Sequence, residues 1–414
     1  MPPIPRDPSF DSTLALPLDG YAFIMKRQAR LQSDLFETRL LLQKTICMSG
    51  AEAARLFYDN ERFVRKGAMP RRIQLTLIGR GGVQGLDCEA HRARKRLFMA
   101  LMTPESIARL LALTAAEWGR ALPSWEQRRR VVLFDELQPI LCRAACRWAG
   151  VPLLEEEVGR RTAEMAAMID GAGGIGLRHW RARRARRRAE AWARTRIEAI
   201  RADRLPAEPE SAAARIAAHR DPRGKLLPSQ IAAVELLNIV RPIVAVARFI
   251  TFAALALHEH PVERERLARD DAYLEQFVHE VRRYYPFFPF AAARTARAFE
   301  WKGYRFPKGR RVLLDLYGTN HDPRLWPEPD AFRPERFADW KGDPFTLIPQ
   351  GGGDYYANHR CAGEQITVQL MKLAVRLLVT KIAYNVPRQD LRVRLSRIPT
   401  LPSSRFVIEG VRRL

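Results

Sequence analysis

The stretch FTLIPQGGGDYYANHRCAGE, residues 345–364, decides how this chain is interpreted. Its three consecutive glycines, at 351–353, allow the backbone to lie close against a flat or bulky group, because glycine has no side chain. Cys361 then stands at the start of an apolar segment that predicts a helix from about 362 to 380. Backbone N–H groups at the positive end of a helix stabilise a thiolate, as does the neighbouring His359. We therefore expect a lowered pKa and a chemical role for Cys361.

Two other kinds of site compete with a ligand-binding cysteine. A phosphate-binding loop follows a strand and ends in Gly-Lys-Ser or Gly-Lys-Thr, and the sequence contains neither ending. A nucleophilic cysteine needs a general base, which His359 can supply, so this alternative stays open on the residues alone. The five cysteines are an odd number and fit no zinc pattern, and Cys142 and Cys146 are expected to be small buried hydrophobic residues.

Two further elements precede the cysteine loop in a fixed order. The segment Glu280-Val-Arg-Arg283 places an acid and an arginine three residues apart on one helix face, and residues 332–337 read FRPERF. With the cysteine loop, these elements resemble the cytochrome P450 superfamily. The resemblance implies that Glu280, Arg283 and Arg336 form a buried ion network that supports the loop.

The same resemblance implies a fold and a cofactor. The fold is mainly α (α+β), with a large helical region and a small β region in one domain over residues 1–414. A haem b lies between a long central helix and the cysteine-loop helix, and Cys361 is the ligand of its iron. The sequence outside the motifs is mostly helical in pattern, although residues 72–78, RIQLTLI, have the alternation of a strand.

The cysteine loop is longer than is usual in that superfamily and is similar to the loop of the bacterial fatty-acid peroxygenases. Matching stretches extend from about residue 65 to 375, and they are Gln84–Asp87 with His91, Arg241–Pro242, Tyr285–Phe290, Asp315–Pro323, Ile348–Gly353 and His359–Gly363. This resemblance implies a haem-thiolate enzyme that uses hydrogen peroxide to hydroxylate fatty acids at the α and/or β carbon. It also implies that no flavin, nicotinamide or redox partner is needed.

The middle of the central helix, expected from about 229 to 259, supports this interpretation. Ordinary members of the superfamily carry an acid followed by threonine there, whereas residues 238–247 read NIVRPIVAVA. Pro242 removes a backbone N–H and is expected to kink the helix. Arg241 stands among apolar neighbours, where an arginine requires a carboxylate partner. The resemblance assigns catalytic roles to both, with Arg241 holding a substrate carboxylate that relays a proton; the alternative is an internal salt bridge.

Other site residues follow from the resemblance. Gln84 stands where the alkene-forming members have histidine, and a neutral amide there is expected to favour hydroxylation over decarboxylation. The expected partners of the haem propionates, each of which can equally be an ordinary charge, are His91, Lys95, Arg294 and His359. The expected lining of an acyl channel, which core packing explains equally well, is Leu77, Phe287 and Phe290.

The formal net charge of +24 raises the question of an anionic partner. Much of the excess lies in residues 179–190, HWRARRARRRAE, which predicts a helix with a solvated arginine-rich face. Peripheral contact with a membrane or a polyanion is the alternative, and no nucleic-acid motif accompanies the segment. The start of the chain has no signal-peptide pattern and no apolar run is long enough to span a bilayer, so a cytoplasmic protein is expected.

Three other functions remain to be compared with the peroxygenase. A conventional monooxygenase takes electrons from a redox partner, and the missing acid–threonine pair argues against it. A decarboxylase of the same family forms terminal alkenes, and Gln84 argues against it. A non-enzymatic nucleic-acid-binding or haem-sensing protein has no need of a buried arginine such as Arg241.

Overall fold

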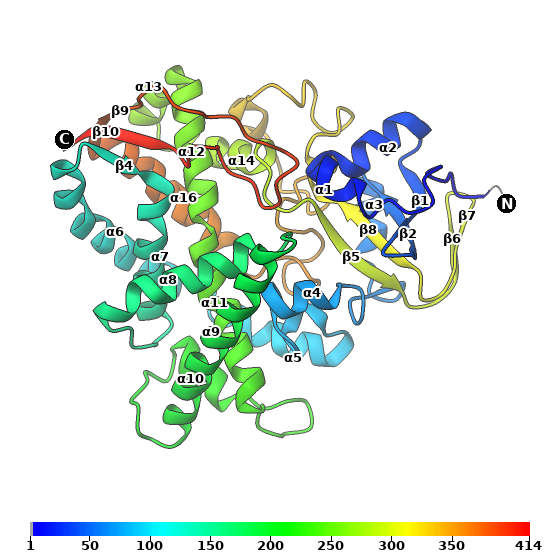
Figure 1. Ribbon diagram of the computed structural model, residues 1–414, viewed down its shortest axis with the longest axis horizontal. Coiled ribbons are helices and arrows are strands. Elements are labelled where there is room, and N and C mark those ends of the chain that lie inside the picture. Colours follow the sequence, from blue (N-terminus) through cyan, green and yellow to red (C-terminus); the bar gives the residue numbers. More distant parts are fainter. Residues whose placement is uncertain (1–2) are drawn as a thin grey trace.

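Helices make up most of residues 3–414, the part of the chain that the computed structural model describes (Figure 1). This confirms the expected mainly helical fold with a small β region. In chain order the α-helices are α1 Ala15–Asp19, α2 Phe23–Leu31, α3 Ala51–Phe57, α4 Arg71–Ile73, α5 Cys88–Met99, α6 Pro104–Gln127, α7 Leu133–Trp148, α8 Glu155–Asp170, α9 Leu177–Arg201, α10 Ala212–Ala218, α11 Ser229–Ala245, α12 Ala247–Glu259, α13 Pro261–Arg269, α14 Tyr273–Tyr284, α15 Leu316–Asn320 and α16 Glu364–Thr380.

The strands of the described residues form three small sheets. The largest has the order β1-β2-β8-β5-β3 and lies beside the N-terminal helices (Figure 1). Its β2 and β8 are parallel, whereas its other neighbours are antiparallel. A second sheet, β4-β10-β9, lies near the C-terminus, and β6 and β7 form a hairpin. The strands are β1 Leu35–Leu40, β2 Gln43–Met48, β3 Phe63–Val64, β4 Arg130–Val132, β5 Phe290–Thr295, β6 Phe299–Trp301, β7 Tyr304–Phe306, β8 Arg311–Asp315, β9 Ile382–Asn385 and β10 Val407–Arg413.

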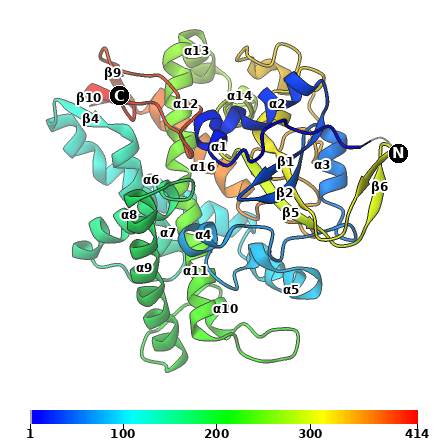
Figure 2. The ribbon, with the colours of Figure 1, turned by 45° about the vertical axis from the view of Figure 1, so that its right-hand side comes forward.

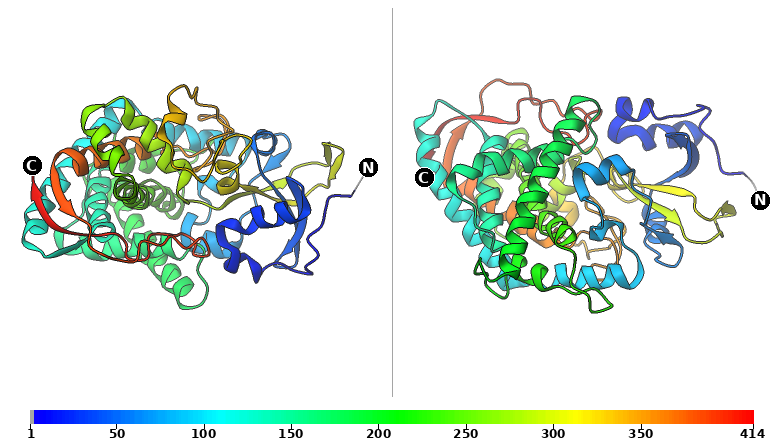
Figure 3. Two further views of the ribbon diagram at one scale, coloured as in Figure 1. Left: turned by 90° about the horizontal axis from the view of Figure 1, so that it is seen from above. Right: turned by 60° about the horizontal axis from the view of Figure 1, so that its bottom comes forward.

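Helices α11 and α12 together form the expected central helix. They are interrupted at Val246, one turn beyond Pro242, whose missing N–H leaves one backbone carbonyl without its helical bond. The expectation that no apolar segment is long enough to span a bilayer is wrong for this helical segment, which is long and apolar enough by length and composition, but 94% of its most apolar window is buried inside the protein. A helix that is apolar all round is stable when it is buried. It is accordingly the core of the helical region, and Figure 3 (left) looks along it.

The expected ion network is present and reaches the cysteine loop. Glu280 and Arg283 of α14 are fully buried and lie 2.7 Å apart, and Arg336 approaches the same carboxylate at 3.3 Å. Arg283 also donates to the carbonyl oxygen of Asn320, whose side-chain oxygen accepts the N–H of Ile348 at 2.9 Å. The network therefore joins α14 to the segment that leads to Cys361.

Residues 72–78 do not form the strand that their alternation predicts. Helix α4 passes into a π-helical turn, η2, over Gln74–Ile78. The Thr76 hydroxyl donates to the carbonyl oxygen of Arg72 at 3.0 Å, and Arg186 of α9 donates to the carbonyl oxygen of Leu77 at 2.7 Å. These bonds hold the segment helical against α9, because strand propensity is weak and depends on context.

Candidate active site

A cavity lies between the middle of α11 and the loop that carries Cys361. Helix α5, the turn η2 and the segment before β5 supply its other walls. Most of the site residues expected from the sequence line it together: Leu77, Gln84, His91, Lys95, Arg241, Pro242, Phe287, His359 and Cys361.

The cysteine loop turns tightly at its glycines. Gly351 and Gly353 have φ of 91° and 82°, a region that favours glycine, and a Cβ on Gly352 would lie 2.5 Å from the carbonyl oxygen of Pro344. The N–H of Cys361 donates to the carbonyl oxygen of Gln350 at 3.3 Å, and the Gln350 amide lies 3.8 Å from the sulfur. These contacts hold the cysteine against the cavity.

The expected lowering of the Cys361 pKa is wrong for the protein alone. Burial raises the pKa of this thiol and Glu364 raises it further, while Lys95 and the N–H of Gly363 oppose them. Desolvation outweighs the helix end because protein atoms surround the thiol, although Cys361 keeps partial access to the cavity. A metal ion that binds the sulfur removes the proton outright, so the raised pKa is compatible with a metal ligand.

A buried basic cluster lies on one side of the cavity. The rings of His91 and His359 stack with centroids 3.8 Å apart, and the Lys95 ammonium donates to the carbonyl oxygen of Arg360 at 2.5 Å. Burial, followed by the charges of Lys95 and Arg65, lowers the pKa of His91 to about 4. The buried Nδ1 of His359 has no hydrogen-bond partner among the described residues. The ammonium of Lys95 and the ring nitrogens of the two histidines can serve as hydrogen-bond donors to an anionic ligand.

Arg294 and Phe290 lie elsewhere, on β5. Arg294 donates to the carbonyl oxygens of Gly67 and Gly309 at 2.8 and 2.9 Å, outside the cavity lining. Phe290 packs in an apolar cluster beside the large sheet. The structure thus does not support the expected roles of these two residues. Phe288, which no sequence motif distinguished from its neighbours, lines the cavity instead.

Arg241 is buried in the cavity wall without an acidic partner. Within residues 3–414 it makes no salt bridge; its Nη2 lies 3.4 Å from the side-chain oxygen of Asn238, and its Nε has no partner. Burial, and then repulsion by Arg186, lower the pKa of Arg241 to about 9, so the guanidinium is still charged at neutral pH. The internal salt bridge that was the alternative for Arg241 is absent from the described residues.

Gln84 completes a short polar chain in the same wall. Its side-chain oxygen accepts from the Asn238 amide at 3.2 Å, and the Asn238 oxygen faces Arg241. The Asn238 amide also donates to Glu235 at 3.0 Å, and this carboxylate is itself paired with Arg94. Glu235 is therefore already paired with Arg94. The cavity wall holds the positive charge of Arg241 beside the neutral amides of Asn238 and Gln84.

The remaining wall is apolar. Leu77 and Ile78 of η2 pack with Ile169 and Ala245, and Phe287 borders the same cluster. The Phe287 ring stacks on Phe249 of α12 with centroids 4.2 Å apart, which fixes its position. This wall offers an unbranched hydrocarbon chain a continuous apolar surface that begins near Arg241.

The residues of this cavity fit a haem. Cys361 supplies a sulfur ligand, and the basic cluster supplies partners for two carboxylates. Gly363 lines the cavity, and a Cβ there would meet nothing within 4 Å, so a flat group can lie against the backbone. Among the described residues, the protein has no group of three or more His, Cys, Asp or Glu side chains that could hold a metal ion by themselves.

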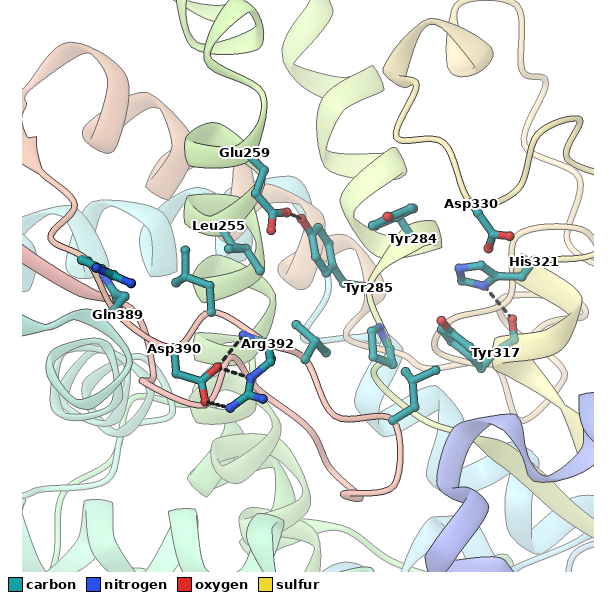
Figure 4. A pocket seen from close by; sticks show the side chains of 15 residues that line it. Leu255, Glu259, Tyr284, Tyr285, Tyr317, His321, Asp330, Gln389, Asp390 and Arg392 are labelled. Atoms are coloured by element: carbon teal, nitrogen blue, oxygen red, sulfur yellow. Dashed lines mark hydrogen bonds and ion pairs between the residues drawn. The ribbon is translucent and has the colours of Figure 1, made fainter.

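A wider cleft of about 940 Å³ lies on another part of the surface (Figure 4). Its polar groups largely satisfy one another: Tyr285 donates to Glu259 at 3.0 Å, and Asp390 pairs with Arg392 at 2.7 Å. It contains neither Cys361 nor the basic cluster. We therefore place the candidate active site in the cysteine-lined cavity.

Comparisons with known proteins agree with this assignment. The family model "Cytochrome P450" matches residues 268–405. Cytochrome P450 3A17 of Cavia porcellus is 32% identical over 34% of this chain, but the match spans only 28% of that protein. The putative cytochrome P450 120 of Synechocystis is 24% identical over 95% of this chain and 92% of that protein. The fold and the cysteine site thus define a haem-thiolate protein of the cytochrome P450 class.

Comparison with solved structures identifies the family within the cytochrome P450 class. A variant of cytochrome P450SP alpha (CYP152B1) has a TM-score of 0.96 and 51% identity, covering 97% of this chain and 99% of its own. Cytochrome P450EX alpha (CYP152N1) with myristic acid has a TM-score of 0.98 and 44% sequence identity, and the match covers both chains in full. Ligand-free cytochrome P450 OleT has a TM-score of 0.97 and 38% sequence identity, and the match covers 99% of each chain. The chain belongs to the CYP152 family of cytochromes P450, as its motifs predict, and its haem iron has a cysteine ligand.

Proposed function

We propose that the protein uses hydrogen peroxide to hydroxylate fatty acids at the α and/or β carbon. The observation that carries the proposal is the buried guanidinium of Arg241, which has no acidic partner within residues 3–414 and shares its cavity with an apolar wall. A fatty acid has the matching chemistry, one carboxylate followed by a hydrocarbon chain. Two of the similar solved structures are complexes with carboxylic acids, myristic acid in one and ibuprofen in the other.

Arg241 is proposed to bind and orient the carboxylate. An ion pair with charge-assisted hydrogen bonds is strong in a site without water, and the guanidinium has already lost its own water. Because the carboxylate is held, the two carbons next to it are held as well. Oxidation close to the carboxyl end follows from this anchoring, whereas the distal chain rests on Leu77 and Phe287.

The substrate carboxylate is also proposed to move the proton. The α11–α12 residues that line the cavity are Asn238, Ile239, Arg241, Pro242, Ile243, Ala245 and Val246, and none of them is an acid or an alcohol. Thr251 is buried outside the lining and donates to the carbonyl oxygen of Ala247. A carboxylate held by Arg241 is then the group that can act as general acid and base in the site.

A bound haem would supply the oxidising centre for the transfer of one peroxide oxygen atom into a C–H bond, with the other oxygen released as water. Cys361 would hold its iron through the sulfur, and His91, Lys95 and His359 are the proposed partners of its carboxylates. No electron donor is needed, because peroxide brings both oxidising equivalents.

A comparison of a fatty acid with its methyl ester tests this proposal. With peroxide as the added oxidant, we expect 2- and 3-hydroxy acids from the free acid and almost no oxidation of the ester, which lacks the carboxylate. Adding a short acid such as acetate should allow oxidation of an unrelated small molecule, because it supplies the missing group. Equal turnover of acid and ester would contradict the proposed role of the carboxylate. Turnover that appears only with a reductase and nicotinamide would favour the conventional monooxygenase.

Changing Gln84 to histidine should raise the fraction of terminal alkene. The Gln84 amide is neutral at all relevant pH, whereas a histidine can deliver a proton beside Asn238 and Arg241. We expect hydroxy acids to dominate in the unmodified protein, and alkene to increase in Gln84→His but not in the matched control Gln84→Asn. Product ratios are measured by mass spectrometry. Mainly alkene from the unmodified protein would overturn this assignment and favour the decarboxylase.

A further inference from the structure

Helix α9 carries an unpaired cationic stripe. Its segment 181–188 holds five arginines without an ion pair among the described residues, namely Arg181, Arg183, Arg184, Arg187 and Arg188. The ion pairs of this helix involve Arg186, Arg194 and Arg196 instead. Four of the five unpaired arginines are exposed. An ordinary solvated helix intersperses acids with its arginines, so this stripe favours an anionic partner.

The stripe begins at an exposed apolar end. Ile175, Leu177 and Trp180 are 64%, 78% and 60% exposed. Leu177 and Trp180 are three residues apart, and the positions 181, 184 and 188 continue the same face of the helix. Arg183 lies over the Trp180 ring at 4.9 Å. We call residues 175–188 on this side the α9 face; it is apolar at one end and strongly cationic along the rest.

The apolar end of the α9 face lies beside the wall of the active-site cavity. Arg72 of α4 donates to the carbonyl oxygen of Gly174, just before the exposed residues. Ala172, two residues earlier, packs against the cluster that contains Leu77 and Ile78 of the cavity wall. Figure 2 shows α4 next to α9. The exposed apolar side chains at the start of α9 therefore lie close to the apolar wall of the active-site cavity.

We propose that the α9 face binds the surface of an anionic lipid bilayer. Arginines pair with lipid phosphates, Trp180 suits the interface between headgroups and chains, and Ile175 and Leu177 can enter the apolar layer. Nucleic acid offers phosphates but no apolar phase for these two aliphatic side chains. A second copy of the chain would bring two cationic stripes together.

The consequence for the enzyme rests on the proposed function, whereas binding itself does not. A fatty acid partitions into the same bilayer, with its carboxylate at the headgroup level. Binding through the α9 face places the neighbouring cavity wall near this store of substrate. The cationic stripe and the buried Arg241 would then act on the same molecules in sequence.

Vesicle flotation tests the proposal with the full-length holoprotein. The probes are vesicles of phosphatidylcholine with phosphatidylglycerol and vesicles of phosphatidylcholine alone. We expect binding to the former that weakens as salt is raised, since salt screens surface charge, and little binding to the latter. The test variant is Arg181→Glu/Arg184→Glu/Arg188→Glu, for which we expect about a hundredfold weaker binding. A second variant, Leu177→Ser/Trp180→Ser, should also weaken binding because it removes the apolar anchor.

A charge-matched control separates the α9 face from the net charge of the molecule. Arg129→Glu/Arg147→Glu/Arg305→Glu changes the charge equally at exposed arginines that have no ion pair in the described structure and lie outside α9. We expect this control to bind like the unmodified protein, and all variants to keep the haem spectrum. Equal loss in the control, or absence of vesicle binding, would overturn the proposal. Arginine-dependent binding to duplex DNA without vesicle binding would overturn it in favour of nucleic acid.

Discussion

Changing Arg241 to methionine should remove most fatty-acid oxidation while leaving the haem in place. A hydrogen bond to a charged group contributes roughly 1.5–3 kcal/mol, which corresponds to about 10- to 150-fold in substrate binding. The positioned carboxylate is lost as well, and a general acid–base group of this kind contributes roughly 10²- to 10⁴-fold in rate. We therefore expect kcat/KM for fatty acids to fall by at least about 10³-fold, measured by product formation with saturating peroxide.

The same variant should not destabilise the substrate-free protein. Arg241 is a buried charge without an acidic partner in the described residues, and such a charge costs free energy in the folded state. The matched control is Arg248→Met, on α12, because Arg248 is equally buried but is paired with Asp170. Arg248→Met should lower the thermal midpoint and retain carboxylate-dependent activity. Unchanged turnover in Arg241→Met would contradict the anchoring role. A lower thermal midpoint in Arg241→Met than in the control would contradict the conclusion that Arg241 lacks an acidic partner in the folded protein.

Changing Cys361 to alanine should abolish the thiolate spectrum and all peroxide-dependent hydroxylation. The ferrous carbon-monoxide complex of the unmodified protein is expected at the red-shifted position of a thiolate-ligated haem, because electron donation from sulfur tunes the iron. Cys142→Ala is the control, since Cys142 is fully buried outside the cavity. It should keep the red-shifted absorption. Retention of that absorption in Cys361→Ala would exclude this residue as the ligand.

The parts of the site that could be predicted from sequence are those in which a polar residue needs a nearby partner. The ion network of Glu280, Arg283 and Arg336 was implied by the resemblance of their two motifs to the cytochrome P450 superfamily, and the structure contains that network. Cys361 was identified from its glycine loop and the helix after it, and it lines the cavity. The local sequence indicates where these residues lie, because the spacing of residues within a motif determines their relative positions.

Other features depend on tertiary contacts that a sequence does not contain. Phe290 and Arg294 belong to a strand, and nothing in the alternation tells which face of a sheet meets a cavity. The pKa of Cys361 depends on how deeply the loop is buried, and burial outweighs the helix end. Whether Arg241 has an acidic partner depends on all the residues that surround it in the fold. The chain around 241 showed that an anion was needed, but only the fold shows that the protein supplies none among the described residues.

Turnover of a long-chain fatty acid by the purified haem protein with ¹⁸O-labelled hydrogen peroxide, without oxygen or reductase, tests the proposed oxidant and the proposed anchor together. Mass spectrometry then gives both the source of the inserted oxygen and the carbon that carries it. We expect labelled 2- and 3-hydroxy acids, because Arg241 is proposed to hold the carboxyl end and peroxide is the proposed oxidant. Unlabelled product, or hydroxylation near the methyl end of the chain, would contradict it.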